Sequence, residues 1–197
     1  STDFVFKGDQ NIPYKPEDKI SPINFYGKSK ADGEKSIRKI LANNSLTIRT
    51  SWLMGSRGKN FLTTMIDLHK KNKVIKVVYD QIGSPTSLSS LSFVCWKAIQ
   101  TYEKGISVDT NVLHWSDAGV ASWYDVATSI GEIAKDFGIL NKPAKVIPIL
   151  SKEYPTLAKR PNYSVLDSSL TCSKLDIEQI HWRKNLVDNI KTIAGNI

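Results

Sequence analysis

The sequence predicts an α/β protein, in which a parallel sheet is followed by a smaller mixed α/β lobe. Three observations support this class: short runs of strand-forming residues, amphipathic stretches at helical spacing, and the alternation of the two over the first half of the chain. The 197 residues are 41% hydrophobic, which suits a soluble globular protein with one sizeable core.

The first half of the chain shows the alternation most clearly. Residues 4–6 are a run of strand formers, and the two prolines within residues 8–18 predict an irregular loop. Residues 24–42 carry apolar side chains at helical spacing and end at two asparagines, which predicts a helix. The further elements expected in this half are a buried strand at 46–50, an amphipathic helix at 60–71 and a strand at 74–79.

The second half alternates less regularly. Ser122 reads as the cap of a helix that runs to about Phe137, with an acidic residue in its first turn. The other elements expected here are a helix at 89–101, a strand at 111–115, a short strand at 146–149 and a last helix at 186–194. We therefore expect this half to contribute mainly to the smaller lobe.

Composition narrows the classes of partner. The net charge is +8, but the lysines are spread along the chain, and the densest run, residues 69–73, has no interleaved aromatic side chains to stack on bases. We therefore predict no nucleic-acid partner.

Other features bear on membranes, compartment and metals. No run of residues approaches the ~20 apolar residues of a membrane helix. Cys95 and Cys172 lie far apart, so a reducing cytoplasm fits best. The three histidines lack metal-ligand spacing, which predicts no catalytic metal.

Tyr26 and Lys30 stand four residues apart within the predicted helix, and Thr2 lies upstream. Residues at i and i+4 share a helix face, so the ammonium would lie beside the phenol and lower its pKa from the ordinary ~10. A phenol of this kind can protonate a carbonyl oxygen near neutral pH. About one Tyr-x-x-x-Lys match is expected by chance in a chain of this composition, so the surrounding motifs decide its meaning.

Five motifs in order carry a family resemblance: S-T-D-F-V-F-K-G at 1–8, P-I-N-F-Y-G-K-S-K at 22–30, R-T-S-W at 49–52, G-K-N-F at 58–61 and D-Q-I-G-S-P-T at 80–86. Together they resemble the extended short-chain dehydrogenase/reductase family. The likeness is greatest to its members that reduce the 4-keto group of a nucleotide-linked 4-keto-6-deoxysugar with NADPH or NADH. The last motif favours these reductases over the related epimerases and dehydratases.

The resemblance implies roles for individual residues. Thr2, Tyr26 and Lys30 would be catalytic, with Tyr26 as the proton donor and Lys30 also holding the nicotinamide ribose. The cofactor would contact Tyr26, Lys30 and Ser51, and the substrate-binding candidates are Asp3, Trp52, Asn60 and Arg160. Simpler interpretations stay open: a helix cap for Asn60, a core position for Trp52 and a solvated side chain for Arg160.

Two departures from the family pattern matter. The 11 glycines never form the G-x-x-G-x-x-G turn that holds the cofactor pyrophosphate, so the chain resembles the C-terminal two-thirds of an enzyme. Phe4 replaces a tyrosine that is usual in the family. We expect residues 1–80 to form the C-terminal part of a Rossmann-like catalytic domain, and residues 81–197 to form mainly the substrate-binding lobe, with some elements returning to the sheet.

The sequence therefore predicts a nicotinamide-dependent ketoreductase of nucleotide sugars, with the chain alone inactive. Its expected partners are the nucleotide-sugar substrate and either a missing N-terminal half or a second copy in a homodimer. A different class remains open, namely a regulatory or binding subunit that kept the fold without catalysis. The retained hydroxyl, phenol and lysine argue modestly against this alternative.

Overall fold

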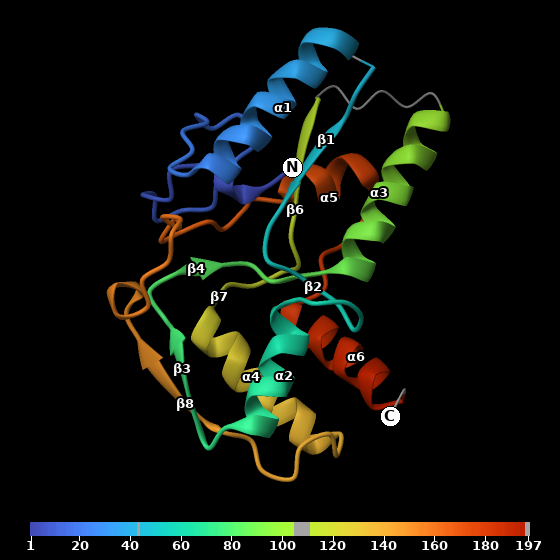
Figure 1. The fold of residues 1–197 in the computed structure, drawn as a ribbon. Coiled ribbons are helices and arrows are strands. Elements are labelled where there is room, and N and C mark those ends of the chain that lie inside the picture. Colours follow the sequence, from blue (N-terminus) through green and yellow to red (C-terminus); the bar gives the residue numbers. More distant parts are fainter. Residues whose placement is uncertain (43, 105–110, 196–197) are drawn as a thin grey trace.

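The computed structural model describes residues 1–42, 44–104 and 111–195. Two pairs of parallel strands organise it, one in the upper and one in the lower half of Figure 1. In the upper half β1 (Thr47–Thr50) pairs with β6 (Val112–Trp115). In the lower half β3 (Val74–Val78) pairs with β8 (Lys145–Ile149). The predicted α/β class with parallel strands is confirmed.

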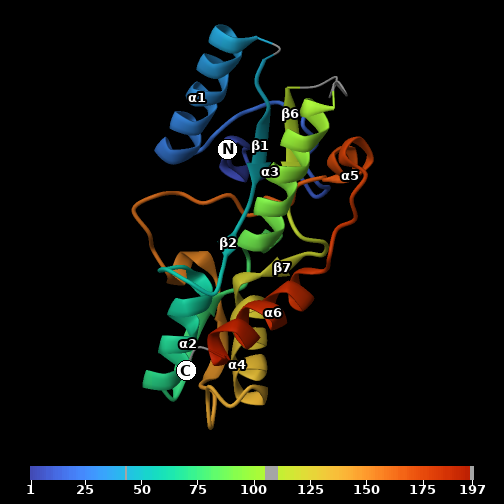
Figure 2. The ribbon, with the colours of Figure 1, turned by 90° about the vertical axis from the view of Figure 1, so that its right-hand side faces the viewer.

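Helices cover both faces of the β1–β6 pair (Figures 1 and 2). On one face α3 (Leu88–Glu103) and α5 (Ser169–Leu175) enclose an apolar cluster, against which Ile48 packs. On the other face α1 (Phe25–Leu41) lies opposite Arg49. Successive side chains of a strand point to opposite faces, so β1 ties the two layers together. This strand ends directly before Ser51 and Trp52.

The larger core lies around the β3–β8 pair. It is enclosed by α2 (Phe61–Lys71), α4 (Trp123–Asp136) and α6 (Trp182–Ala194) (Figure 1). Two short pairs run between the halves: β2 (Leu53–Met54) is parallel to β5 (Thr86–Ser87), and β4 (Ile82–Gly83) is antiparallel to β7 (Ala121–Ser122). Segments from both sides of residue 80 enter each cluster, and the expected domain division at that residue stays a prediction.

The expected strand at residues 4–6 is wrong. Asp3–Val5 form a 3-10 helix, η1, because the Thr2 hydroxyl caps it by accepting the Phe4 N–H. Val5 and Phe6 are buried in a cluster with Tyr14, so their apolar character reflects packing and not strand pairing.

Other elements were not predicted or were misplaced. The short helices α5 and η2 (Ser151–Glu153) and the four two-residue strands were not predicted, because so few residues carry no periodic signal. The last helix begins at Trp182, earlier than expected, with His181 as its cap. Cys95 and Cys172 are free thiols. No helix in the described part of the chain has the length and apolarity needed to cross a membrane.

Candidate active site

Tyr26 and Lys30 lie in the first two turns of α1. Asn24 caps this helix, since its side-chain oxygen accepts the Gly27 N–H at 2.8 Å. Tyr26 is half-exposed, and the Lys30 Nζ lies 5.8 Å from the centre of its ring. The predicted helix and the juxtaposition of the two side chains are confirmed. Together they present a phenol and an ammonium on an exposed surface.

The first turn of α1 packs directly on η1. A Cβ at Gly27 would lie 2.1 Å from the Phe4 carbonyl oxygen, so only glycine permits this approach. The Phe4 ring meets the Tyr26 ring edge-on, with 5.8 Å between their centres. These contacts place the S-T-D motif beside the Tyr26 helix.

Thr2 is buried and hydrogen-bonded on both sides. Its hydroxyl donates to Asp3 Oδ1 at 2.9 Å and accepts the Phe4 N–H at 3.3 Å. Asp3 is buried as well, and this burial raises the pKa of its carboxyl to about 6, although hydrogen bonds from Ser164 and Thr2 act against the rise. The only proton of the Thr2 hydroxyl is therefore directed at Asp3.

Ser51 and Trp52 follow β1, as predicted. The buried Ser51 hydroxyl donates to the Ser84 carbonyl at 2.7 Å. Trp52 has a positive φ of 45°, which is strained for a bulky residue, and its indole stacks on that of Trp123 with 3.6 Å between ring centres and 6° between planes. The indole of Trp52 is therefore held in place by its neighbour, and its contact with the substrate stays a prediction.

Asn60 acts as the cap of α2. Its Oδ1 accepts the N–H groups of Leu62 and Thr63, and its Nδ2 donates to the carbonyls of Gly55, Arg57 and Gly58. Both ends of the amide are therefore used within the chain. The structure shows the simpler of the two interpretations of Asn60, and its contact with substrate stays a prediction.

Arg160 lines a cavity of about 530 Å³ between α2 and β3. Apolar and aromatic side chains dominate the walls, which include Phe61, Trp123 and Tyr154. The loop that carries Arg160 also reaches the Tyr26 helix, because Asn24 Nδ2 donates to the Lys159 carbonyl at 2.8 Å. One short segment thus connects the cavity with the first turn of α1.

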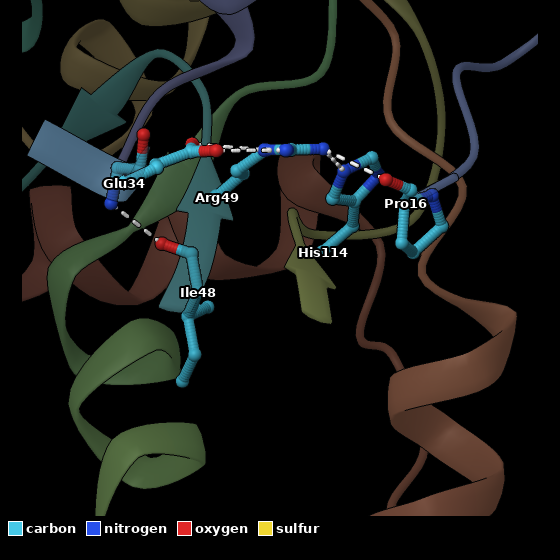
Figure 3. Close-up of polar contacts among 6 residues, drawn as sticks. Pro16, Glu34, Ile48, Arg49 and His114 are labelled. Carbon is cyan, nitrogen blue, oxygen red and sulfur yellow. Dashed lines mark hydrogen bonds and ion pairs between the residues drawn. The ribbon is translucent and has the colours of Figure 1, made fainter. Parts of the chain in front are cut away.

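A buried ion pair behind the site was not predicted (Figure 3). Arg49 Nε donates to Glu34 Oε1 at 2.9 Å and Arg49 Nη2 donates to Oε2 at 2.8 Å, while Nη1 donates to the Pro16 carbonyl and to His114 Nε2. A guanidinium only donates, so Nε2 of His114 accepts and its Nδ1 donates to the Tyr14 carbonyl. Glu34 comes one turn after Lys30, and the pair therefore fixes α1, the helix that carries Tyr26, on β1.

The buried network shifts the pKa values of both His114 and Glu34 downward. Burial and the Arg49 charge lower the pKa of His114 to about 4, so the imidazole is neutral at pH 7. Burial opposes the ionised form of Glu34, but the hydrogen bonds and charge of Arg49 outweigh it, and the pKa of Glu34 is lowered. Arg49 lies within a motif that carries the resemblance and Glu34 follows another one, yet their separation in the sequence gave no sign that the two side chains pair.

Asp3 and His114 should oppose each other in the pH dependence of stability. Folding raises the pKa of Asp3 from 3.8 to about 6, so the folded state takes up this proton at a higher pH than the unfolded state does. Asp3 therefore adds stability as the pH falls from about 6 to about 4. The unfolded state binds the His114 proton first, because the folded pKa falls from 6.5 to about 4, so this group removes stability over nearly the same window. At about 1.4 kcal/mol per pKa unit, each effect is about 3 kcal/mol.

We therefore expect Asp3→Asn to reveal the loss that His114 causes. Urea denaturation gives the unfolding free energy of both proteins at each pH. As the pH is lowered from 7 to 4, the unfolding free energy of the variant should fall by about 3 kcal/mol more than that of the unchanged chain. His114→Gln should change in the opposite direction. Parallel stability curves for Asp3→Asn and the unchanged chain would contradict the assignment to Asp3.

The fold and the site define an α/β domain of the kind found in Rossmann-like reductases. Residues 1–194 match the family model described as the RmlD substrate binding domain, and the chain belongs to this family. Membership of the broader short-chain dehydrogenase/reductase family stays a prediction. The described residues contain no cluster of His, Cys, Asp or Glu side chains that could hold a metal ion.

The similar proteins include several dTDP-4-dehydrorhamnose reductases. A dTDP-4-dehydrorhamnose reductase of Aggregatibacter actinomycetemcomitans is 37% identical over 98% of this chain and 65% of its own length. The spore coat polysaccharide biosynthesis protein SpsK of Bacillus subtilis is 37% identical over 94% of the chain and 60% of its own length. The chain therefore spans less than two thirds of these relatives.

Solved structures agree with the fold. A dTDP-4-dehydrorhamnose reductase of Bacillus anthracis in complex with NADP superimposes with a TM-score of 0.84 at 36% identity, over 96% of this chain and 63% of that protein. An orthologue from Clostridium acetobutylicum gives 0.85 at 36% identity, over 98% and 64%. A UDP-galactose 4-epimerase, at 16% identity and a TM-score of 0.74, shares the fold alone.

Proposed function

We propose that the complete protein reduces the 4-keto group of a dTDP-linked 4-keto-6-deoxysugar of the dTDP-4-dehydrorhamnose type, with NADPH or NADH as the reductant. The observation that carries this proposal is the half-exposed Tyr26 phenol with the Lys30 ammonium 5.8 Å from its ring centre, beside the buried Thr2. The names of the relatives and the NADP in the Bacillus anthracis structure support it. The proposed compartment is the cytoplasm.

We propose that residues of this chain donate the proton and position the reacting groups. The bound nicotinamide supplies the hydride, and the substrate oxygen that gains negative charge receives its proton from Tyr26. Lys30 is exposed and makes no hydrogen bond or ion pair that the described structure records, so its ammonium is available to the ribose hydroxyls and to the phenol. Thr2 would donate to the same oxygen once its hydroxyl turns from Asp3.

The cavity beside Arg160 is the proposed site for the nucleotide. A planar guanidinium can bind two phosphate oxygens at once, and the aromatic walls suit a flat base. The loop contact between Lys159 and Asn24 would then align the diphosphate with the Tyr26 helix. Asp3, Trp52 and Asn60 remain proposed substrate contacts near this path.

Cofactor binding should need more protein than this chain provides. The 197 residues contain no glycine-rich pyrophosphate turn, and large apolar side chains such as Ile40 on α1 and Phe93 on α3 are exposed. We infer that a part with the pyrophosphate turn packs against these helices. A homodimer partner is the other proposed cover.

The isolated chain is therefore expected to bind NADPH weakly. The prediction is checked by titrating the 197-residue chain with NADPH and following cofactor fluorescence, with the complete protein as the control. Equal affinity of the two proteins would show that residues 1–197 suffice for the cofactor and would contradict the prediction.

The activity itself is tested with the complete protein, NADPH and dTDP-4-dehydrorhamnose. We expect the near-ultraviolet absorbance of NADPH to fall with time only when dTDP-4-dehydrorhamnose is present. No oxidation, together with co-purification of the protein with a larger enzyme, would favour the regulatory class instead.

A further inference from the structure

Both faces of the Trp52 indole are covered. The Trp123 ring lies parallel to one face, at 3.6 Å between centres. A Cβ at Gly83 would lie 2.6–2.8 Å from Cε2, Cζ2 and Nε1 of Trp52, which places Gly83 against the ring. Because the stacked Trp123 leaves no room on its own side, Gly83 must lie on the other face. A sugar therefore cannot lie flat on Trp52, and only the edge of the indole is available.

One antiparallel strand pair, β4 with β7, positions both residues that cover the Trp52 indole, Gly83 and Trp123. Gly83 of β4 pairs with Ala121 of β7, and Ile82 pairs with Ser122. Trp123 follows directly, as the first residue of α4, where Ser122 and Asp125 form a reciprocal capping box. The spacing of the two covering residues is thus set by backbone hydrogen bonds, so that Trp52 has little freedom to rotate.

Trp123 also separates Trp52 from the cavity. It contacts Phe61, with 4.5 Å between ring centres, and both rings belong to the cavity wall, whereas Trp52 does not. The indole N–H of Trp52 makes no hydrogen bond that the described structure records. An edge with a free N–H is suited to donate to a sugar hydroxyl.

We propose that Trp123 is a positioning residue, which holds Trp52 edge-on so that its indole N–H, and not its ring face, meets the sugar of the substrate. This inference rests on the proposed function. It makes the S-W-Y-D segment a determinant of how the sugar is held, and it assigns Gly83 the role of leaving room for the ring. The family resemblance had implied only that Trp52 contacts the substrate.

The test compares Trp123→Leu, Trp123→Phe and Gly83→Ala in the complete protein. Two stacked indoles give an exciton couplet in far-ultraviolet circular dichroism, which reports the stack without any activity. We expect Trp123→Leu to lose the couplet and Trp96→Leu, which removes a tryptophan of α3 outside the stack, to retain it. A couplet that survives Trp123→Leu would overturn the proposal.

Ligand binding separates positioning from folding. Affinities for dTDP and dTDP-rhamnose are measured by calorimetry with the oxidised cofactor present. Trp123→Leu also removes an aromatic ring from the wall of the proposed nucleotide cavity, so the affinity for dTDP should fall as well. We expect the dTDP-rhamnose affinity to fall by a further factor of about 2 to 12 beyond that of dTDP, the range of an aromatic pair. Trp123→Phe should restore part of this loss, and KM should rise more than kcat falls.

Gly83→Ala supplies the independent variant. Its backbone lies outside the left-handed region, so the backbone conformation permits alanine, but the methyl group would lie 2.6–2.8 Å from ring atoms of Trp52 and must displace that ring. We expect a weaker affinity for dTDP-rhamnose and an unchanged affinity for dTDP. Equal losses for both ligands in all variants, or no loss for either, would overturn the proposal. Failure of the unchanged protein to bind dTDP-rhamnose would instead refute the proposed function. The exciton couplet would then still test whether Trp123 stacks on Trp52.

Discussion

Tyr26→Phe in the complete protein is expected to lower kcat by about 10²- to 10⁴-fold, the usual contribution of a positioned general acid. The substitution removes one oxygen atom, and the ring can keep its edge-on contact with Phe4, whose centre lies 5.8 Å away. The loss should appear in kcat and in kcat/KM alike, because the proton is transferred only in the transition state. Steady-state rates of NADPH oxidation measure it.

The matched control is Tyr102→Phe, which removes the same atom from an exposed residue of α3. Its rates should stay close to those of the unchanged protein. A second comparison is Lys30→Met, which removes the ammonium beside the Tyr26 ring and leaves the phenol in place. If Tyr26→Phe retains most of its turnover, the assignment of the proton donor is wrong.

Local patterns predicted the part of the site that lies within one helix and at one strand end. Tyr26 and Lys30 share a face because the helix geometry fixes the direction of residues four apart. Ser51 and Trp52 come directly after β1, because the preceding residues form a good strand. In each case the prediction needed only neighbouring residues.

Contacts between distant segments could not be predicted in this way. Trp52 and Trp123 stack although they lie far apart in the sequence, and Glu34 and Arg49 pair between a helix and a strand. Nothing in the spacing of these residues marks them as partners. The strand expected at residues 4–6 was wrong because the apolar side chains there are buried by contacts with distant residues and not by strand pairing. The local backbone is instead set by the cap that Thr2 forms.

Loss of the Glu34–Arg49 pair should have the largest effect on stability. The two side chains are 8% and 2% exposed and form two parallel hydrogen bonds, so neither charge can be solvated if its partner is removed. Breaking a buried pair in this way typically costs about 3–5 kcal/mol. We therefore expect Arg49→Met to lower the unfolding free energy by about that amount, measured by urea denaturation at pH 7.

The exposed pair of Arg183 and Glu132 is the matched control. It has the same chemistry and a similar distance of 2.9 Å, but its side chains are 46% and 55% exposed. Glu132→Gln should cost less than about 1 kcal/mol, because water screens the charges. The double variant of Glu34→Gln with Arg49→Met should be more stable than the sum of the two single losses predicts, since no unpaired charge is left buried. Additive losses would show that the two side chains act independently, and that Arg49 does not hold the Tyr26 helix through Glu34.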